Sequence, residues 1–151
     1  MIVSDSTTLI VLLDLERTAL LSNLFDSIII PPSVYDEITI KNKNTLPSWI
    51  VVQEVEDSEM LEALKLLLDR GESEAIALAL TLKMPLIIDE KKGRNIALRE
   101  GLEILGLLGI VYLNIKKEYM NIAEARVFVE DAVAHGYRIS TALIEQMFTR
   151  L

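Results

Sequence analysis

Four acidic side chains stand where predicted strands end or where the helices that follow them begin: Asp5, Glu37, Glu72 and Asp89. In a parallel sheet these positions lie at one edge, which is where open α/β sheets bind ligands. Carboxylates that converge there repel one another unless a cation lies between them. A cluster with only oxygen ligands suits Mg²⁺ or Mn²⁺. Such ions hold phosphates and activate water for in-line displacement.

Each carboxylate also has an ordinary structural interpretation. Asp5 could cap a helix or bind backbone N–H groups in a turn. Glu37 could be a solvated helix residue and Asp89 a turn residue. Glu72 and Glu74 could complement the dipole of the helix that they open. The occurrence of acids in three separate strand–helix units favours the cation site, with Glu74 as an alternative ligand to Glu72.

Three cations, Lys91, Lys92 and Arg94, follow Asp89 directly. If they begin a helix, they lie where the helix dipole disfavours positive charge. Departures from such local preferences are often found at functional sites. These three side chains could therefore bind substrate phosphates. A solvated charged turn is the alternative. His135 precedes Gly136 at a predicted helix end and is interpreted as structural.

The composition limits the chemistry that is possible. The chain has 151 residues, a net charge of −8, no cysteine and one histidine. Disulfides, thiolate sites, a cysteine nucleophile and a multi-histidine zinc site are therefore excluded. The negative charge argues against a broadly basic nucleic-acid-binding surface, but a local basic patch beside a bound cation stays possible. The longest apolar run, 104–113, is about half of what a transmembrane helix needs, and no signal peptide is recognisable. We expect a cytoplasmic protein.

The elements that must position these residues alternate along the chain. Strands are predicted at 1–4, 27–30, 50–52, 86–88 and 103–105. Helices are predicted after Asp5, at 18–25, from Pro32, at 57–69, from Glu72 to Leu82, before Gly101, and at 107–117, 122–134 and 141–149. Ser6 or Thr7 is the expected cap of the first helix, and residues 41–47 are expected to form a polar loop. This alternation predicts one α/β domain, 1–151, with a parallel sheet covered on both faces.

Several segments together resemble the PIN-domain family. They are Ser4-Asp5-Ser6 after an apolar strand, Ile30-Pro31-Pro32-Ser33-Val34-Tyr35-Asp36-Glu37-Ile38, the central GESEAIALA…LIIDEKKGR, residues 105–110 and the tail 136–140. The likeness covers nearly the whole chain. It is closest to a PIN-like branch of predicted nucleic-acid-binding proteins of unknown function.

This resemblance implies a three-layer α/β/α sandwich with strand order 3-2-1-4-5. It also implies a Mg²⁺- or Mn²⁺-dependent ribonuclease, a class that includes the VapC toxins of toxin–antitoxin pairs. By motif, Asp5, Glu37, Glu72 and Asp89 match the family's acidic residues, with Glu at position 72 where many PIN proteins have Asp. A homodimer and an antitoxin partner are implied by the family alone.

The leading hypothesis is therefore an endoribonuclease toxin in which Asp5, Glu72 and Asp89 bind the cation, Glu37 binds it directly or through water, and Lys91 and Arg94 contact RNA. The first alternative is a catalytically inactive PIN-like module that binds RNA or protein. A phosphoacceptor domain is disfavoured because Asp5 has no acidic neighbour in sequence. A dinucleotide enzyme is disfavoured because no glycine-rich loop follows the first strand.

Overall fold

A five-stranded parallel sheet forms the centre of the molecule in the computed structural model, which describes residues 1–42 and 45–151. The strands lie in the order β3-β2-β1-β4-β5. Their bounds are β1 Ile2–Ser4, β2 Ile28–Ile30, β3 Ile50–Val52, β4 Leu86–Ile87 and β5 Ile104–Leu105. The predicted α/β class, the parallel sheet and the strand order 3-2-1-4-5 are confirmed.

The helices are α1 Ser6–Asp14, α2 Ala19–Ser22, α3 Pro32–Lys41, α4 Glu59–Lys65, α5 Arg70–Leu82, α6 Lys91–Arg99, α7 Leu107–Lys116, α8 Ile122–Ala134 and α9 Thr141–Thr149. The longest of these, α5 and α8, have 13 residues each, and among the described residues no helix has the length and apolarity of a membrane span.

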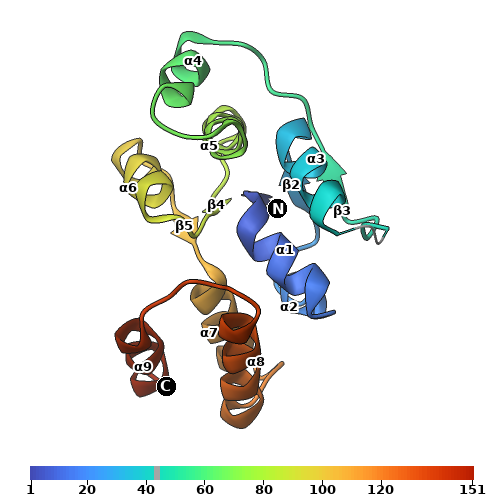
Figure 1. Cartoon of the computed structure of the whole chain (residues 1–151), viewed down its shortest axis with the longest axis vertical. Helices are drawn as coiled ribbons and strands as arrows, with labels where there is room; N and C mark the ends of the chain where they lie inside the picture. Colours follow the sequence, from blue (N-terminus) through green and yellow to red (C-terminus); the bar gives the residue numbers. More distant parts are fainter. Residues whose placement is uncertain (43–44) are drawn as a thin grey trace.

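The strands are apolar on both faces, as expected for a parallel sheet covered by helices. Because successive side chains of a strand point to opposite faces, each strand contributes to two separate cores. Val3, Ile29, Leu86 and Ile88 pack with α4, α5 and α6 on one face. Ile2, Ile28, Ile30 and Ile87 pack on the other face with α1, α2, α3 and the C-terminal helices. The result is a sandwich of helices, sheet and helices (Figure 1).

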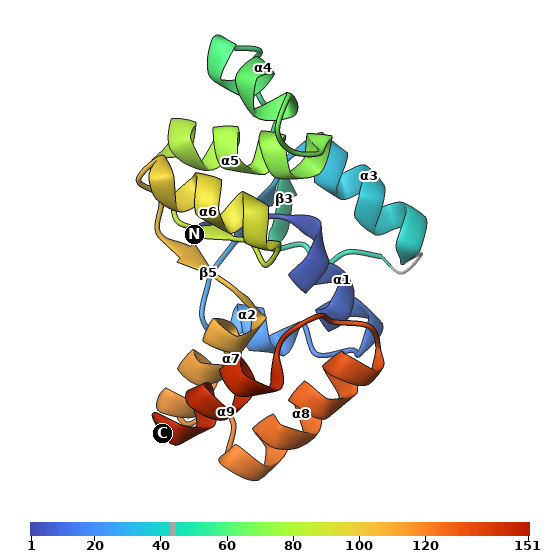
Figure 2. The same cartoon turned by 60° about the vertical axis from the view of Figure 1, so that its left-hand side comes forward.

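The three C-terminal helices gather at one end of the molecule, away from α4, α5 and α6 (Figure 2). Buried residues of α7, α8 and α9 belong to the same core as β1 and β2, so this end of the chain packs on the sheet as part of one body. The connector between α8 and α9, residues 135–140, returns toward the sheet. It thereby brings residues from the end of the chain to the carboxyl edge of the strands.

Two predicted boundaries are wrong in ways that affect the site. The helix predicted at 57–69 ends at Lys65 in α4, and the next helix begins at Arg70 with Asp69 as its N-cap. The first helix begins at Ser6, so neither Ser6 nor Thr7 caps it. The other helix and strand bounds agree with the prediction to within a few residues. Part of the predicted loop 41–47 lies outside the described residues, and Lys41 belongs to α3.

Phe128 of α8 tests how firmly the C-terminal helices are joined to the sheet. Its side chain is 1% exposed, and the Arg17 guanidinium lies 5.3 Å from its ring centroid. We expect Phe128→Ala to lower the free energy of unfolding by about 3–5 kcal/mol because it leaves a cavity. Denaturant unfolding measures this, with the exposed Val127→Ala as control, expected within about 0.5 kcal/mol of wild type. Equal stability of both variants would contradict this packing.

Candidate functional site

Asp5 lies at the carboxyl end of β1, the central strand of the sheet. Its side chain is only 5% exposed, and among the described residues it makes no capping hydrogen bond to α1. Burial raises the pKa of Asp5 to about 7, against a smaller opposing effect of the Ser6 backbone. The carboxylates of Asp69, Glu37 and Asp89 add to the rise. The side chain is therefore a desolvated acid surrounded by other acids, which does not suit an ordinary helix cap.

Asp69 belongs to the same cluster, although it is not among the acids predicted from the sequence. Its Oδ1 accepts a hydrogen bond from the backbone N–H of Glu72 at 2.8 Å and so fixes the start of α5. A methyl group placed on Gly71 would lie 3.6 Å from Asp5 Oδ1 and 3.7 Å from Asp69 Oδ1. The two carboxylates thus border the same glycine. The spacing Asp69-x-x-Glu72, which is the pattern of a capping box, could have identified Asp69 as a cap.

Glu72 is buried beside Glu90, the N-cap residue of α6. Glu72 Oε2 has no hydrogen-bond partner among the described residues. Burial, followed by the contacts with Glu90 and Asp69, raises the pKa of Glu72 well above its usual range. Burial alone would also raise the pKa of Glu90, but hydrogen bonds with the backbone N–H of Gly93 and with the Glu72 side chain lower it. The pair can therefore share a proton, or a cation can take that proton's place.

Gly93 makes this close approach possible. A methyl group on it would lie 2.8 Å from Glu72 Oε2 and 2.7 Å from Ile88 Cδ1, which is too close for a real side chain. The glycine therefore leaves the space in which the Glu72 carboxylate reaches the start of α6.

Glu37 and Glu74 have different surroundings. Glu37 accepts a hydrogen bond from Ser6 Oγ at 2.6 Å, which holds it beside the end of β1. Glu74 accepts hydrogen bonds from Ser33 Oγ at 2.5 Å and from Arg70 Nε at 3.1 Å. Although burial opposes the shift, these two partners lower the pKa of Glu74. Its carboxylate is thus already neutralised by Arg70, which favours Glu72 over Glu74 as a cation ligand.

Asp89 is held by three donors from three different elements. Tyr137 Oη donates to Asp89 Oδ1 at 2.6 Å, the backbone N–H of Leu107 donates to the same oxygen at 3.1 Å, and Thr8 Oγ1 donates to Asp89 Oδ2. Burial and the neighbouring Asp89 raise the pKa of Tyr137, so the tyrosine remains a donor. Asp89 therefore connects α1, the start of α7 and the α8–α9 connector to the end of β4.

Glu72 and Asp89, which the sequence predicts to meet at one edge of the sheet, have no hydrogen bond to each other among the described residues. Glu72 interacts with Glu90 and Asp69 and is influenced electrostatically by Asp5, whereas Asp89 is bound by Thr8, Leu107 and Tyr137. Asp5 is influenced by both sides of this arrangement. The carboxylates predicted from the sequence thus gather at one edge, with Asp5 as their common neighbour.

The basic residues after Asp89 do begin a helix, α6, with Lys91 as its first residue. The carboxylate of Glu90 accepts from the backbone N–H groups of Lys92 and Gly93 at 3.1 and 2.8 Å, and this cap offsets the unfavourable cations. Lys91 is exposed, whereas Arg94 is partly buried and points toward Gly106. Arg94 and Asp89 both approach to 2.8 Å of the position that a methyl group on Gly106 would take.

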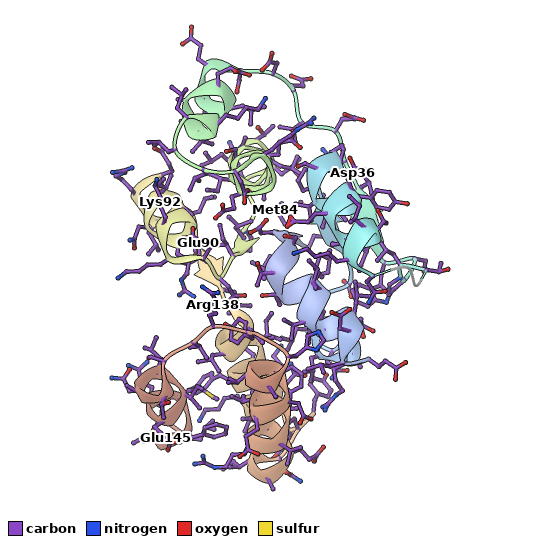
Figure 3. The ribbon with its side chains drawn as sticks, viewed as in Figure 1. Asp36, Met84, Glu90, Lys92, Arg138 and Glu145 are labelled. Carbon is purple, nitrogen blue, oxygen red and sulfur yellow. The ribbon has the colours of Figure 1, made fainter. Side chains whose placement is uncertain are left out.

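A cavity of about 480 Å³, which we name the first cavity, opens beside these acids. Its lining includes the acidic side chains of Glu37, Asp89 and Glu90, and the side chains of Lys41, His135 and Arg138. Figure 3 shows Glu90 and Arg138 in the middle of the molecule, between the upper and the C-terminal helices.

His135 also has a structural contact beside this cavity. Its Nε2 lies 2.7 Å from Asp14 Oδ2 and links the end of α8 to the end of α1. No local sequence pattern places Lys41 or Arg138 beside the acids. Lys41 ends α3 and Arg138 lies in the α8–α9 connector, so only the tertiary fold brings them beside the acids.

The donor set fits a divalent cation chemically. Every ligand candidate is a carboxylate, the type that Mg²⁺ and Mn²⁺ prefer, and Glu72 Oε2 is a buried oxygen without a partner among the described residues. Yet no group of three or more Asp, Glu or His side chains within those residues is arranged closely enough to hold an ion. Ligation of an ion would therefore require these side chains to rearrange.

A comparison with protein families finds that a family model described as a PIN domain matches residues 1–151. The search of curated proteins gives no significant match. The family match confirms the resemblance predicted from the sequence.

The elevated pKa of Asp5 predicts a specific dependence of stability on pH in chelator-treated protein. The pKa is about 7 in the folded state and 3.8 ordinarily. The folded protein therefore keeps a proton that the unfolded chain releases, and this contribution to stability falls as pH rises from about 4 to 7. Asn cannot ionise, so we expect Asp5→Asn to remove this part of the slope and to be more stable at pH 7 by about 2–4 kcal/mol.

Denaturant unfolding at several pH values measures both quantities. Asp36→Asn is the control, because Asp36 is an exposed residue of α3 and should keep the wild-type slope. An Asp5→Asn variant with the wild-type slope and stability would show that Asp5 is not a desolvated acid.

Proposed function

The chain belongs to the PIN-domain family, and on this premise we propose that it is a Mg²⁺- or Mn²⁺-dependent endoribonuclease, the toxin of a toxin–antitoxin pair. PIN domains are generally nucleases that use divalent metals. The family membership therefore supports phosphodiester hydrolysis, and the residues at the sheet edge support the metal dependence.

The observation that carries the proposal is the burial of Asp5 among other acids. A folded protein keeps a desolvated carboxylate beside like charges only where it is protonated or where a cation compensates it. Asp69, Glu37 and Asp89 all raise the pKa of Asp5, and Asp5 in turn raises that of Glu72. Such perturbed acids cluster at functional sites.

Asp5 and Glu72 are the residues that would hold the cation most directly. Asp69 and Glu90 lie beside them and would complete the oxygen ligands or orient water. Glu37, fixed by Ser6, would bind the ion directly or through water. Asp89 would join the ligands when it exchanges one of its hydrogen bonds for the cation.

A bound Mg²⁺ or Mn²⁺ supplies a water of lowered pKa and compensates the charge of the phosphate. The chain's own residues bind and orient the substrate. Lys91 and Arg94 at the start of α6, and Arg138 at the first cavity, offer cations to the RNA backbone. These three basic side chains belong to a protein whose net charge is −8. The charge distribution therefore favours a local phosphate site over a general affinity for nucleic acid.

By family resemblance, we further propose that the protein acts in the cytoplasm as a homodimer and that an antitoxin protein neutralises it.

A second candidate function is RNA or protein binding without catalysis. It is favoured by the state of Asp89, whose carboxylate is occupied by Thr8, Leu107 and Tyr137. If those bonds persist in solution, Asp89 contributes structure and not ligation.

Cleavage of single-stranded RNA by purified protein tests the proposal. We expect activity with Mn²⁺ or Mg²⁺ that is lost with a chelator, and a decrease of at least about 100-fold in Asp5→Asn, because the variant lacks the central carboxylate. Asp36→Asn, next to Glu37 on the exposed face of α3, should cleave at the wild-type rate. Cleavage by Asp5→Asn at that rate would contradict the site assignment, and RNA binding without cleavage by wild type would favour the second candidate.

A further inference from the structure

A second cavity, of about 500 Å³, lies between α7 and α9. These two helices lie side by side in both views (Figures 1 and 2). Asp89 and Arg94, which take part in the function proposed above, line one part of the cavity, and its other lining residues have no role in that function. Its walls include Leu108, Leu143 and Met147, and its polar groups include Arg94, Gln146 and Arg150, together with Asp89, Tyr112 and Tyr137. The volume is within the range of small-ligand pockets, which are mostly apolar with a few polar groups that fix orientation.

The second cavity shares two lining residues with the first. Asp89 and Tyr137 line both cavities, and the Tyr137 hydroxyl donates to Asp89 across a distance of 2.6 Å. A ligand in the second cavity therefore lies next to one of the proposed catalytic carboxylates. A chain molecule whose backbone passes Asp89 can occupy both cavities at once.

The charges of the second cavity favour an anionic ligand. Within residues 1–42 and 45–151, the guanidinium groups of Arg94 and Arg150 form no ion pair and donate no side-chain hydrogen bond. By contrast, Arg70 and Arg126 pair with Glu74 and Glu145. Two unpaired arginines in one groove of an acidic protein are available to phosphate or to a flat ring.

The apolar and aromatic groups favour a nucleobase as the part that enters. Tyr112 is half-buried in the wall, and the Lys116 ammonium lies 5.6 Å from its ring centroid. Unstacked bases of single-stranded RNA bind by stacking on aromatic rings and on arginine planes, with amides reading their edges. Tyr112, Arg150 and Gln146 supply these three kinds of group.

We propose that the second cavity binds one base of single-stranded RNA, next to the phosphate that lies at the carboxylate cluster. The proposal rests on the ribonuclease function and names a determinant of its substrate. Arg94 lies at the boundary and binds the phosphate that connects the base to the cleavage site, whereas Arg150 contacts the base from the α9 side. Such a site explains why the α8–α9 connector is held to the sheet edge through Tyr137.

Leu143→Trp tests this site directly, because Leu143 lines the cavity and is 52% exposed, so a larger ring fills the cavity from its surface. The matched control is Val127→Trp on α8, at 57% exposure. Both are made in an Asp5→Asn background, so that binding is measured without cleavage. Fluorescence anisotropy with labelled single-stranded RNA gives the affinities, and thermal unfolding checks the folding of each variant.

We expect Leu143→Trp and, independently, Arg150→Gln to weaken RNA binding by about tenfold or more, with Val127→Trp unchanged. RNAs that lack one base at successive positions should show one position where base removal weakens binding to the Asp5→Asn parent but not to Leu143→Trp. Parental affinity in both cavity variants, or the absence of such a position, would overturn the proposal. Because only binding is measured, a protein that binds RNA in this way but does not cleave it would refute the ribonuclease function alone.

Discussion

Burial of a carboxylate at the end of the central strand is the constraint on which this structure depends. β1 lies between β2 and β4, so the residue that follows it is surrounded by the helices that begin at the same edge. Asp5 occupies that position and is almost fully buried. An apolar residue or an amide there would be less costly to bury at neutral pH. The surrounding acids increase the free-energy cost of burying this carboxylate. A divalent cation would compensate the repulsion between the carboxylates and so bind favourably.

The acids around Asp5 differ in their hydrogen-bond and ion-pair partners, and this difference indicates which of them are available to bind a cation. Glu74 is neutralised by Arg70, and Asp89 is satisfied by three donors. Glu72 instead leaves a buried oxygen without a partner among the described residues. Cation binding is thus favoured most strongly on the side of Asp5 and Glu72. Asp89 links that site to the C-terminal helices, so that the α8–α9 connector borders both the acids and the second cavity.

The sequence was sufficient to predict the fold and the places of the candidate site residues at the sheet edge. Short apolar strands that alternate with helices predict a parallel sheet, and Asp5, Glu37, Glu72 and Asp89 follow from their places at strand ends and helix starts. Asp69 was missed because the apolar periodicity of 57–68 extended the preceding helix over it, although its capping pattern with Glu72 was visible. Tyr137 could not be predicted, since it lies 48 residues from Asp89 and no local pattern connects them.

Calorimetric titration of metal-free protein with Mn²⁺ tests the central claim most directly. If the buried carboxylates form a cation site, wild type and Asp36→Asn bind Mn²⁺ with the same affinity, and Asp5→Asn and Glu72→Gln lose most of it, typically by 10- to 100-fold or more. Proton release should accompany binding by wild type, because the cation displaces protons held by the raised pKa values of Asp5 and Glu72. Failure of wild type to bind Mn²⁺, or wild-type affinity in Asp5→Asn, would contradict the account.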